Sequence, residues 1–202
     1  GVVNQRGLKK VRSMGAILQA ARTCQTLFAK HRVERVFSVG GFSAAPASIA
    51  AILTKRPLYI HEQNAVGGRL NRLLRPFAKA LFSSYDERSP IRDYPVSQRF
   101  FDAYREREAI RTVIFLGGSQ GALAINDFAL QVAPMLAERK IRILHQTGKL
   151  GYEETLLGYR DLDIDAEVFD FDPHLLERIT QADFAISRAG ASTLWELAAC
   201  GL

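Results

Sequence analysis

Short apolar segments alternate with amphipathic segments along nearly the whole 202-residue chain. The apolar segments predict strands at residues 33–39, 58–60, 80–83, 112–116, 141–146, 166–169 and 184–187. The segments between and after them predict helices at residues 8–30, 47–53, 69–79, 122–137, 152–157, 174–179 and 194–199. Strands that alternate with helices build parallel sheets with helices on both faces. We therefore expect an α/β fold whose ligands bind at the carboxyl ends of the strands.

A polar, proline-containing stretch at residues 85–95 interrupts this alternation. Polar residues and proline between periodic segments mark loops and linkers. We therefore expect two domains, at residues 1–95 and 96–202. A hydrophobic content of 48% is enough for buried cores, and no run of 18 apolar residues predicts a membrane-spanning helix.

Two of the predicted strands lead directly into turns of small residues and then into helices. The first turn consists of Gly117, Gly118, Ser119, Gln120 and Gly121. The second turn occupies residues 188–193. Helix starts carry unpaired N–H groups with a partial positive charge, and glycine lets the backbone approach a ligand, so both turns predict phosphate binding. Glu196, about one helical turn further on, would accept hydrogen bonds from sugar hydroxyls. A simple strand–turn–helix corner with Ser192 or Thr193 as N-cap is the alternative.

The net charge of +6 and a pI near 9.5 favour an anionic partner. Basic and apolar residues share a predicted helix near the N-terminus, at Arg6, Leu8, Lys9, Lys10, Val11, Arg12, Met14 and Leu18. This pattern indicates contact with an anionic membrane surface. An ordinary surface helix whose apolar stripe faces the core is the alternative. Nucleic acid is disfavoured, because the aromatic residues lie mainly in strand-like segments and not between the basic ones.

Four hydrogen-bonding side chains follow the predicted strand at residues 58–60, namely His61, Glu62, Gln63 and Asn64. Such a cluster suits recognition of a polyhydroxylated substrate and supplies an acid–base group. The alternative is a polar loop whose side chains only cap its own backbone. His145, at the end of another strand, is interpreted as structural. Cys24 and Cys200 predict reduced thiols of a cytoplasmic protein, with a disulfide as the alternative. No cluster of His, Cys, Asp and Glu in the sequence has the spacing of a metal site.

Four segments together resemble the MurG family of bacterial glycosyltransferases: residues 40–46, 61–64, 117–122 and 188–196. They occur in the family's order and at about its spacing, so the resemblance covers essentially the whole chain. It implies two Rossmann-like domains of the GT-B type, both incomplete in this internal segment, with the active site in the cleft between them. Residues 1–95 would be the C-terminal part of the acceptor- and membrane-side domain. Residues 96–202 would be the N-terminal part of the UDP-sugar-binding domain.

The resemblance implies an inverting hexosyltransferase of peptidoglycan synthesis that needs no metal or other cofactor. Its members move N-acetylglucosamine from UDP-N-acetylglucosamine to the 4-hydroxyl of undecaprenyl-pyrophosphoryl-muramyl-pentapeptide, converting lipid I to lipid II. The implied location is peripheral, on the cytoplasmic face of the bacterial inner membrane, with roles in cell wall biogenesis, cell shape and cell division. The basic segment at residues 6–18 matches the family's membrane-facing patch.

By the same resemblance, particular residues would contact the substrates. The implied donor contacts are Asn64, Ser119, Asp172 (through its backbone), Ala191, Ser192, Thr193, Leu194, Trp195 and Glu196. His61 and Glu62 are acceptor-side candidates for proton handling or for orientation of the acceptor. The family's main candidate for the catalytic base is a histidine in a glycine-rich loop upstream of this segment.

The chain departs from the family's sequence pattern at two places. Ala44 and Ala45 stand where Ser-Gly is usual, and Ser97 stands where a donor-contacting arginine is usual, with Arg99 close by. Because the upstream loop and the C-terminal uracil-side glutamines are also outside the chain, we expect the 202-residue piece alone to be inactive. The alternatives are a UDP-N-acetylglucosamine 2-epimerase-like enzyme and a non-catalytic nucleotide-sugar-binding module. A dinucleotide oxidoreductase is disfavoured, because G-x-G-x-x-G is absent from the sequence.

Overall fold

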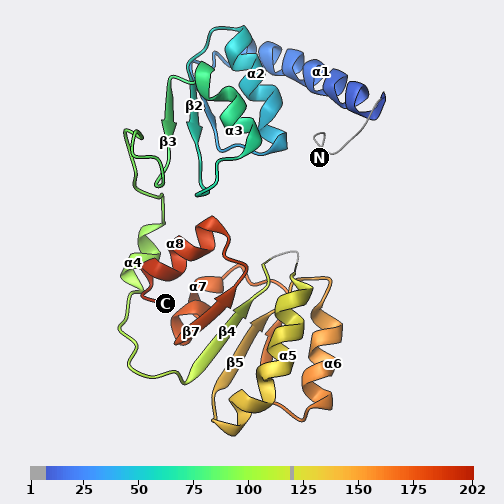
Figure 1. Cartoon of the computed structure of the whole chain (residues 1–202), viewed down its shortest axis with the longest axis vertical. Coiled ribbons are helices and arrows are strands. Elements are labelled where there is room, and N and C mark those ends of the chain that lie inside the picture. The colour runs from blue at the N-terminus through green and yellow to red at the C-terminus, as the bar shows by residue number, and fades with distance from the viewer. Residues whose placement is uncertain (1–7, 119–120) are drawn as a thin grey trace. The chain divides into compact units, whose positions relative to one another are not determined.

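The computed structural model describes residues 8–118 and 121–202, with side chains described from Ser13 onward. The chain divides into two compact units, Gly1–Tyr94 and Pro95–Leu202, each with its own parallel sheet (Figure 1). This division falls beside the boundary expected from the sequence, while what each unit binds stays a prediction. In the described part of the chain, no helix is both long and apolar enough to cross a bilayer.

The sheet of the first unit has the order β1-β2-β3, with β1 at Val36–Ser38, β2 at Leu58–His61 and β3 at Ala80–Phe82. Its helices are α1 (Leu8–Lys30), α2 (Ala45–Leu53) and α3 (Arg69–Leu74), with the 3-10 turns η2 (Phe42–Ala44) and η3 (Arg75–Phe77). The strand predicted at residues 33–39 is shorter because the Val33 N–H bonds to the Phe28 carbonyl, at 2.9 Å, and completes the last turn of α1. The helix predicted at residues 69–79 ends early because Pro76 has no N–H to donate.

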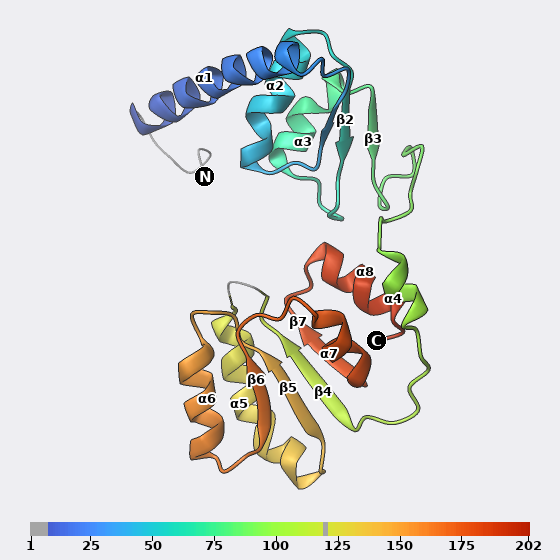
Figure 2. The same ribbon diagram turned by 180° about the vertical axis from the view of Figure 1, so that it is seen from behind.

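The sheet of the first unit packs on its helices through one face (Figure 2). The core on that face consists of Val36, Ala51, Leu58, Ile60 and Leu74. The opposite face carries an aromatic stack, in which the Phe82 ring centroid lies 5.7 Å from that of Phe37 and 6.2 Å from that of Tyr59. Phe37 is 62% exposed. The described residues therefore place helices on one face only, and the expected second layer is not found in this unit.

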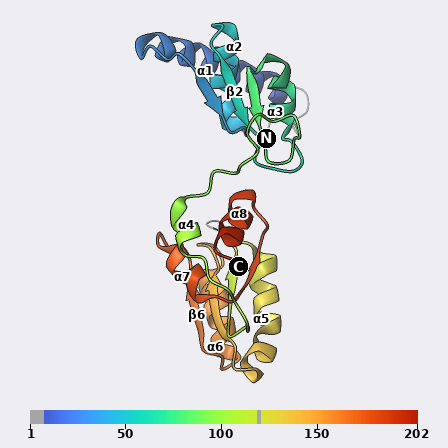
Figure 3. The ribbon, with the colours of Figure 1, turned by 90° about the vertical axis from the view of Figure 1, so that its left-hand side faces the viewer.

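The sheet of the second unit has the order β6-β5-β4-β7, again parallel throughout. Its strands are β4 (Thr112–Leu116), β5 (Arg142–Gln146), β6 (Ala166–Phe169) and β7 (Phe184–Ser187). Its helices are α4 (Gln98–Asp102), α5 (Leu123–Glu138), α6 (Tyr152–Asp161), α7 (Leu175–Gln181) and α8 (Ala191–Ala199). Helices cover both faces of this sheet (Figure 3). Val113 and Phe115 of β4 pack with α5 and α6, while Ile114 and Leu116 pack with α4, α7 and α8.

The segment that follows the domain boundary is fastened to the second unit, although the sequence predicts no element there. It forms α4 and then a strap held by two arginines. Arg105 Nε donates to the Thr180 carbonyl at 3.0 Å. One Arg107 NH group donates to the Cys200 carbonyl at 2.7 Å, just past the end of α8. A cation is favourable at the C-terminus of a helix, so the strap helps to hold α8 in place.

Candidate functional site

The two predicted phosphate-binding turns lie side by side. β4 and β7 are neighbouring strands, and Leu116 pairs in register with Ser187 at their carboxyl ends. Both turns open onto one cavity of about 300 Å³. It is lined by Leu116, Gly117 and Gly118 on one side and by Ser187, Arg188, Gly190 and Thr193 on the other. Two turns that are 70 residues apart in the chain therefore share one candidate site.

The glycine turn after β4 needs its glycines for steric reasons. Gly121 has a φ of +82°, and a Cβ there would lie 2.6 Å from the Thr147 carbonyl oxygen. A Cβ at Gly117 would lie 2.9 Å from the Gln146 carbonyl oxygen. The backbone of the turn therefore lies directly on the end of β5 and the residue after it. Ser119 and Gln120, predicted here, lie outside the described residues.

The start of α8 faces the same cavity with an uncapped first turn. Gly190 is the N-cap, and no side chain among the described residues caps this helix. The alternative in which Ser192 or Thr193 is the N-cap is therefore wrong. The first N–H groups of a helix have no partner within it, so they are left for a ligand. Of the predicted donor contacts on α8, Thr193 lines the cavity. The others are not among the described residues that line it: Ala191, Ser192, Leu194, Trp195 and Glu196.

Two residues that line the cavity belong to neither predicted turn nor to the strand before it, and the sequence does not single them out. Gln146 is the last residue of β5 and Leu175 is the first of α7. Arg188 lies in the second turn, with one NH group 3.5 Å from the Gly121 carbonyl oxygen. The position of Gln146 at the carboxyl end of a predicted strand could have indicated it. For Leu175 nothing in the local sequence signals a site.

Glu196 lies about one turn beyond the start of α8. Burial raises the pKa of Glu196, and the charge of Arg99 partly opposes this effect. The Arg99 guanidinium lies 5.2 Å from the centroid of the Phe100 ring, on α4, and α4 packs against α8. The structure therefore brings Arg99 close to Glu196, in the unit where the family resemblance leaves an arginine missing.

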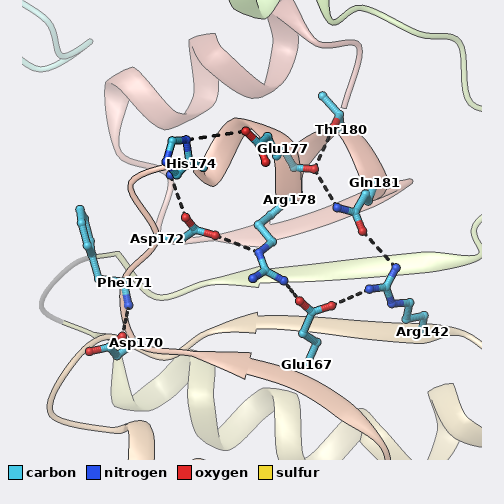
Figure 4. Close-up of polar contacts among 10 residues, drawn as sticks. All are labelled: Arg142, Glu167, Asp170, Phe171, Asp172, His174, Glu177, Arg178, Thr180 and Gln181. Atoms are coloured by element: carbon cyan, nitrogen blue, oxygen red, sulfur yellow. Dashed lines mark hydrogen bonds and ion pairs between the residues drawn. The ribbon is translucent and has the colours of Figure 1, made fainter.

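Asp172 lies in the turn between β6 and α7 (Figure 4). Its carboxylate accepts hydrogen bonds from the His174 N–H at 2.7 Å and from Arg178 Nε at 2.9 Å. Arg178 also pairs with Glu167, which pairs in turn with Arg142. The side chain of Asp172 therefore holds the turn, which leaves its backbone for the predicted contact with the donor.

His145 is confirmed as a structural residue. It is fully buried, with Nε2 3.1 Å from Asn126 Oδ1 and Nδ1 2.9 Å from the Tyr159 hydroxyl. Because an amide oxygen can only accept, Nε2 carries the proton and Nδ1 accepts from Tyr159. Burial lowers the pKa of His145 to about 4, so the ring is neutral near pH 7. Asn126 Nδ2 then donates to the Thr147 carbonyl, against which Gly121 packs.

In the first unit, the buried carboxylate of Glu62 organises the loop after β2. Oε1 accepts from the backbone N–H and the side-chain amide of Asn64, at 3.0 and 3.2 Å. Oε2 accepts from the Gly68 N–H at 2.7 Å and from Asn71 Nδ2 at 2.8 Å. Burial alone would raise the pKa of Glu62, but the four hydrogen bonds outweigh it and lower the pKa. A saturated carboxylate is a weak base, so the geometry favours a positioning role for Glu62.

The other polar residues of this motif surround the same point. His61 ends β2 and is buried, with its ring centroid 5.8 Å from that of Tyr94. Asn64 is exposed beyond Glu62. A Cβ at Gly40 would lie 2.7 Å from Asn71 Nδ2, so the glycine turn after β1 packs directly on the partner of Glu62. The motifs at residues 40–46 and 61–64 therefore meet at the carboxyl ends of β1 and β2.

The predicted membrane patch lies partly on α1. Arg6 and the side chains of Leu8, Lys9, Lys10, Val11 and Arg12 lie outside the described residues. Met14 and Leu18 are 48% and 49% exposed. These two apolar residues do not face the core, whereas Ala21 is 1% exposed and Phe28 packs on the core of the first unit, so α1 also has the inward apolar residues of an ordinary surface helix.

Comparison with solved structures defines the class of this fold. A crystal structure of MurG from Acinetobacter baumannii superposes with a TM-score of 0.69 and 29% sequence identity. The alignment covers 98% of this chain and 59% of that chain. Two Rossmann-like units of this kind are the architecture of GT-B glycosyltransferases, so the predicted α/β fold class is confirmed.

Sequence comparison identifies the family. The glycosyltransferase family 28 N-terminal domain matches residues 1–83, and the glycosyltransferase family 28 C-terminal domain matches residues 112–202. The chain belongs to glycosyltransferase family 28.

Curated relatives confirm the predicted resemblance to MurG. Proteins from Wolinella succinogenes and Sulfurovum sp. (strain NBC37-1) are each 54% identical over 202 residues. Each is named UDP-N-acetylglucosamine–N-acetylmuramyl-(pentapeptide) pyrophosphoryl-undecaprenol N-acetylglucosamine transferase. Each match spans the whole of this chain but only 60% of the length of the relative.

Proposed function

We propose that the full-length protein is an inverting glycosyltransferase that makes lipid II. It transfers N-acetylglucosamine from UDP-N-acetylglucosamine to the 4-hydroxyl of undecaprenyl-pyrophosphoryl-muramyl-pentapeptide, in peptidoglycan synthesis. The names of its relatives support the substrates. The observation that carries the proposal is the single cavity onto which the glycine turn and the start of α8 both open.

That cavity suits the diphosphate of the donor. The uncapped first turn of α8 offers backbone N–H groups and the positive end of a helix dipole. Arg188 lines the cavity and adds a full positive charge. As the bond to the sugar breaks, negative charge grows on the departing UDP, and these fixed donors stabilise it without having to reorganise. The chemistry of the leaving group is therefore assigned to the second unit.

The remaining donor contacts extend from this cavity along α8. We assign the ribose hydroxyls to Glu196 and the neighbouring contacts to Thr193 and the other predicted residues of α8. Arg99, which lies close to Glu196, is our candidate for the missing donor-contacting arginine. Ser119 and Gln120 in the glycine turn and the backbone of Asp172 complete the proposed set.

The first unit is assigned to the acceptor. His61 is the candidate there for proton handling, and Glu62 holds the loop that presents Asn64. The exposed apolar residues Met14 and Leu18 support peripheral attachment of α1 to an anionic membrane, on the cytoplasmic face where the acceptor would be reached.

The test is a transfer assay on the full-length protein with labelled UDP-N-acetylglucosamine and a lipid-linked muramyl-pentapeptide. We expect a lipid-linked disaccharide and one UDP per transfer. Epimerised sugar without acceptor consumption would establish the epimerase-like alternative. Tight donor binding with no product of either kind would establish the non-catalytic module.

A further inference from the structure

A second cavity, of about 510 Å³, lies entirely within the first unit. Its walls come from the loop after β2, from α3 and from the loop after β3. This volume is within the range of small-molecule sites, roughly 300–1,000 Å³, and is far more than a single ion needs. None of the proposed donor contacts except Asn64 lines it. The site proposed for the diphosphate therefore does not include this cavity.

Two carboxylates in the walls are already used to build them. Glu62 accepts four hydrogen bonds from Asn64, Gly68 and Asn71. Asp86, after β3, accepts from the Arg75 guanidinium at 2.7 Å and from the Arg88 N–H at 3.0 Å. Both walls are therefore fixed before any ligand arrives, and preorganised walls reduce the entropic cost of binding.

Two charged groups of the cavity are left over. Arg72 is exposed, and its guanidinium makes no hydrogen bond or ion pair with any described residue. Glu87 is exposed and likewise has no described ion pair. The Oδ1 atom of Asn71 is not one of them, because it is buried beside Gly40, where a Cβ would meet it at 2.8 Å. A free cation and a free carboxylate together match a ligand that carries both anionic and N–H groups.

A peptide has this combination of groups, whereas a bare phosphate has only the anionic part. Arg binds carboxylates through two parallel hydrogen bonds, which gives such a contact both strength and direction. We propose that this cavity binds the peptide part of the acceptor, with a peptide carboxylate on the guanidinium of Arg72. The inference rests on the proposed function, which supplies a muramyl-peptide acceptor.

The first test measures binding, because binding needs no turnover. A soluble muramyl-pentapeptide is titrated calorimetrically into the full-length protein and its variants. Arg72→Gln should weaken binding about 10- to 100-fold, the range for losing a charged hydrogen-bonded contact, and Arg72→Lys should fall between. Arg69→Gln is the matched control, because Arg69 is exposed on the same helix but is not in the described lining. Amidation of the peptide carboxylates should remove the difference between wild type and Arg72→Gln.

Several outcomes would overturn the inference. Arg72→Gln could bind the peptide as tightly as wild type, or Arg69→Gln could lose as much affinity as Arg72→Gln. An Arg72 effect that persists undiminished with the amidated peptide would assign the contact to another anion, such as phosphate. Because Arg72 is exposed, thermal unfolding of Arg72→Gln should match wild type, and this excludes misfolding as the cause.

The second test separates this inference from the proposed function. In the transfer assay, Arg72→Gln should raise KM for the acceptor while leaving kcat and KM for UDP-N-acetylglucosamine unchanged. Transfer by wild type with an unchanged acceptor KM in Arg72→Gln would refute the inference and leave the function standing. Absence of transfer by wild type, with the binding difference intact, would refute the function and leave the peptide site standing.

Discussion

The two units share one pattern of strands and helices but bury their sheets differently. In the second unit all residues of β4 are buried, and helices lie on both faces. In the first unit β1 has a buried, exposed, buried pattern, and the described helices lie on one face. Phe37, the middle residue of β1, is the exposed one, while Ser38 is buried. The comparison teaches that periodicity predicts the order of elements, whereas the number of layers depends on which helices are present to cover each face.

The candidate sites of the two units also differ in kind. The cavity at β4 and β7 offers backbone N–H groups, glycines and one arginine. The cavity beside β2 and β3 is built by side chains, with Glu62 and Asp86 as acceptors at its two walls. Backbone donors suit a diphosphate, while side chains of both charges suit a peptide.

A matched pair of phenylalanines tests the difference in burial. Phe115 of β4 is fully buried, so Phe115→Ala should reduce the free energy of unfolding by about 4 kcal/mol. Phe37→Ala should cost less than about 1 kcal/mol, because Phe37 is 62% exposed. Urea unfolding of the 202-residue chain, followed by circular dichroism, measures both. Equal losses would mean that the open face of the first unit is not open in solution.

Two glycines in one turn test the packing of the site in the second unit. Gly121→Ala should cost about 3 kcal/mol, because the Cβ would combine a positive φ with a 2.6 Å approach to the Thr147 oxygen. Gly118→Ala has a similar φ of +75° but meets nothing within 4 Å, so it should cost only about 1 kcal/mol. The fluorescence of Trp195, the one tryptophan of the chain, follows unfolding of this unit. If both substitutions reduce the free energy of unfolding equally, Gly121 does not pack against the end of β5.

The buried His145 should make the second unit sensitive to acid. Its pKa is about 4 in the folded state, below the ordinary value of 6.5. The neutral ring is therefore favoured by folding, so this stability is complete above pH 6.5 and is lost as the pH falls through 4. The loss should reach about 3 kcal/mol at most. Unfolding free energies of wild type and His145→Gln between pH 7 and 4 measure it, and the same slope in both would exclude His145 as the cause.

Glu62 should give the first unit a separate, smaller response at lower pH. Its pKa is lowered in the folded state, so its contribution is present above the unfolded pKa of 4.5 and is lost as the pH falls below it. Glu62→Gln should cost about 2 kcal/mol at pH 7, because an amide N–H would face the donors of Gly68 and Asn71. Glu87→Gln, at an exposed carboxylate of the same cavity, is the control and should change little. A Glu87→Gln loss as large as that of Glu62→Gln would contradict the assigned role of Glu62.

The sequence predicts the two turns of the second unit well, and for a simple reason. Each turn directly follows an apolar strand, and parallel strands end at the same edge of a sheet, so Gly117 and Thr193 had to lie near one edge. That β4 and β7 are immediate neighbours follows from the strand order, which no local pattern contains.

What the sequence does not predict depends on partners far along the chain. The sequence suggests Glu62 as an acid–base group. It does not reveal that the carboxylate is filled with hydrogen bonds, because one donor is Asn71, nine residues away on α3. The sequence predicts no element for the strap after α4, whose role depends on the contact of Arg107 with the end of α8. The N-cap of α8 is Gly190 rather than a hydroxyl residue, because cap position depends on backbone angles that Ser192 and Thr193 do not reveal.

The most direct measurement is a crystal structure of the full-length protein with UDP-N-acetylglucosamine. The account predicts that the diphosphate lies in the cavity between Gly118 and the first turn of α8, within hydrogen-bond distance of backbone N–H groups there. A diphosphate bound elsewhere, with this cavity filled only by solvent, would contradict it.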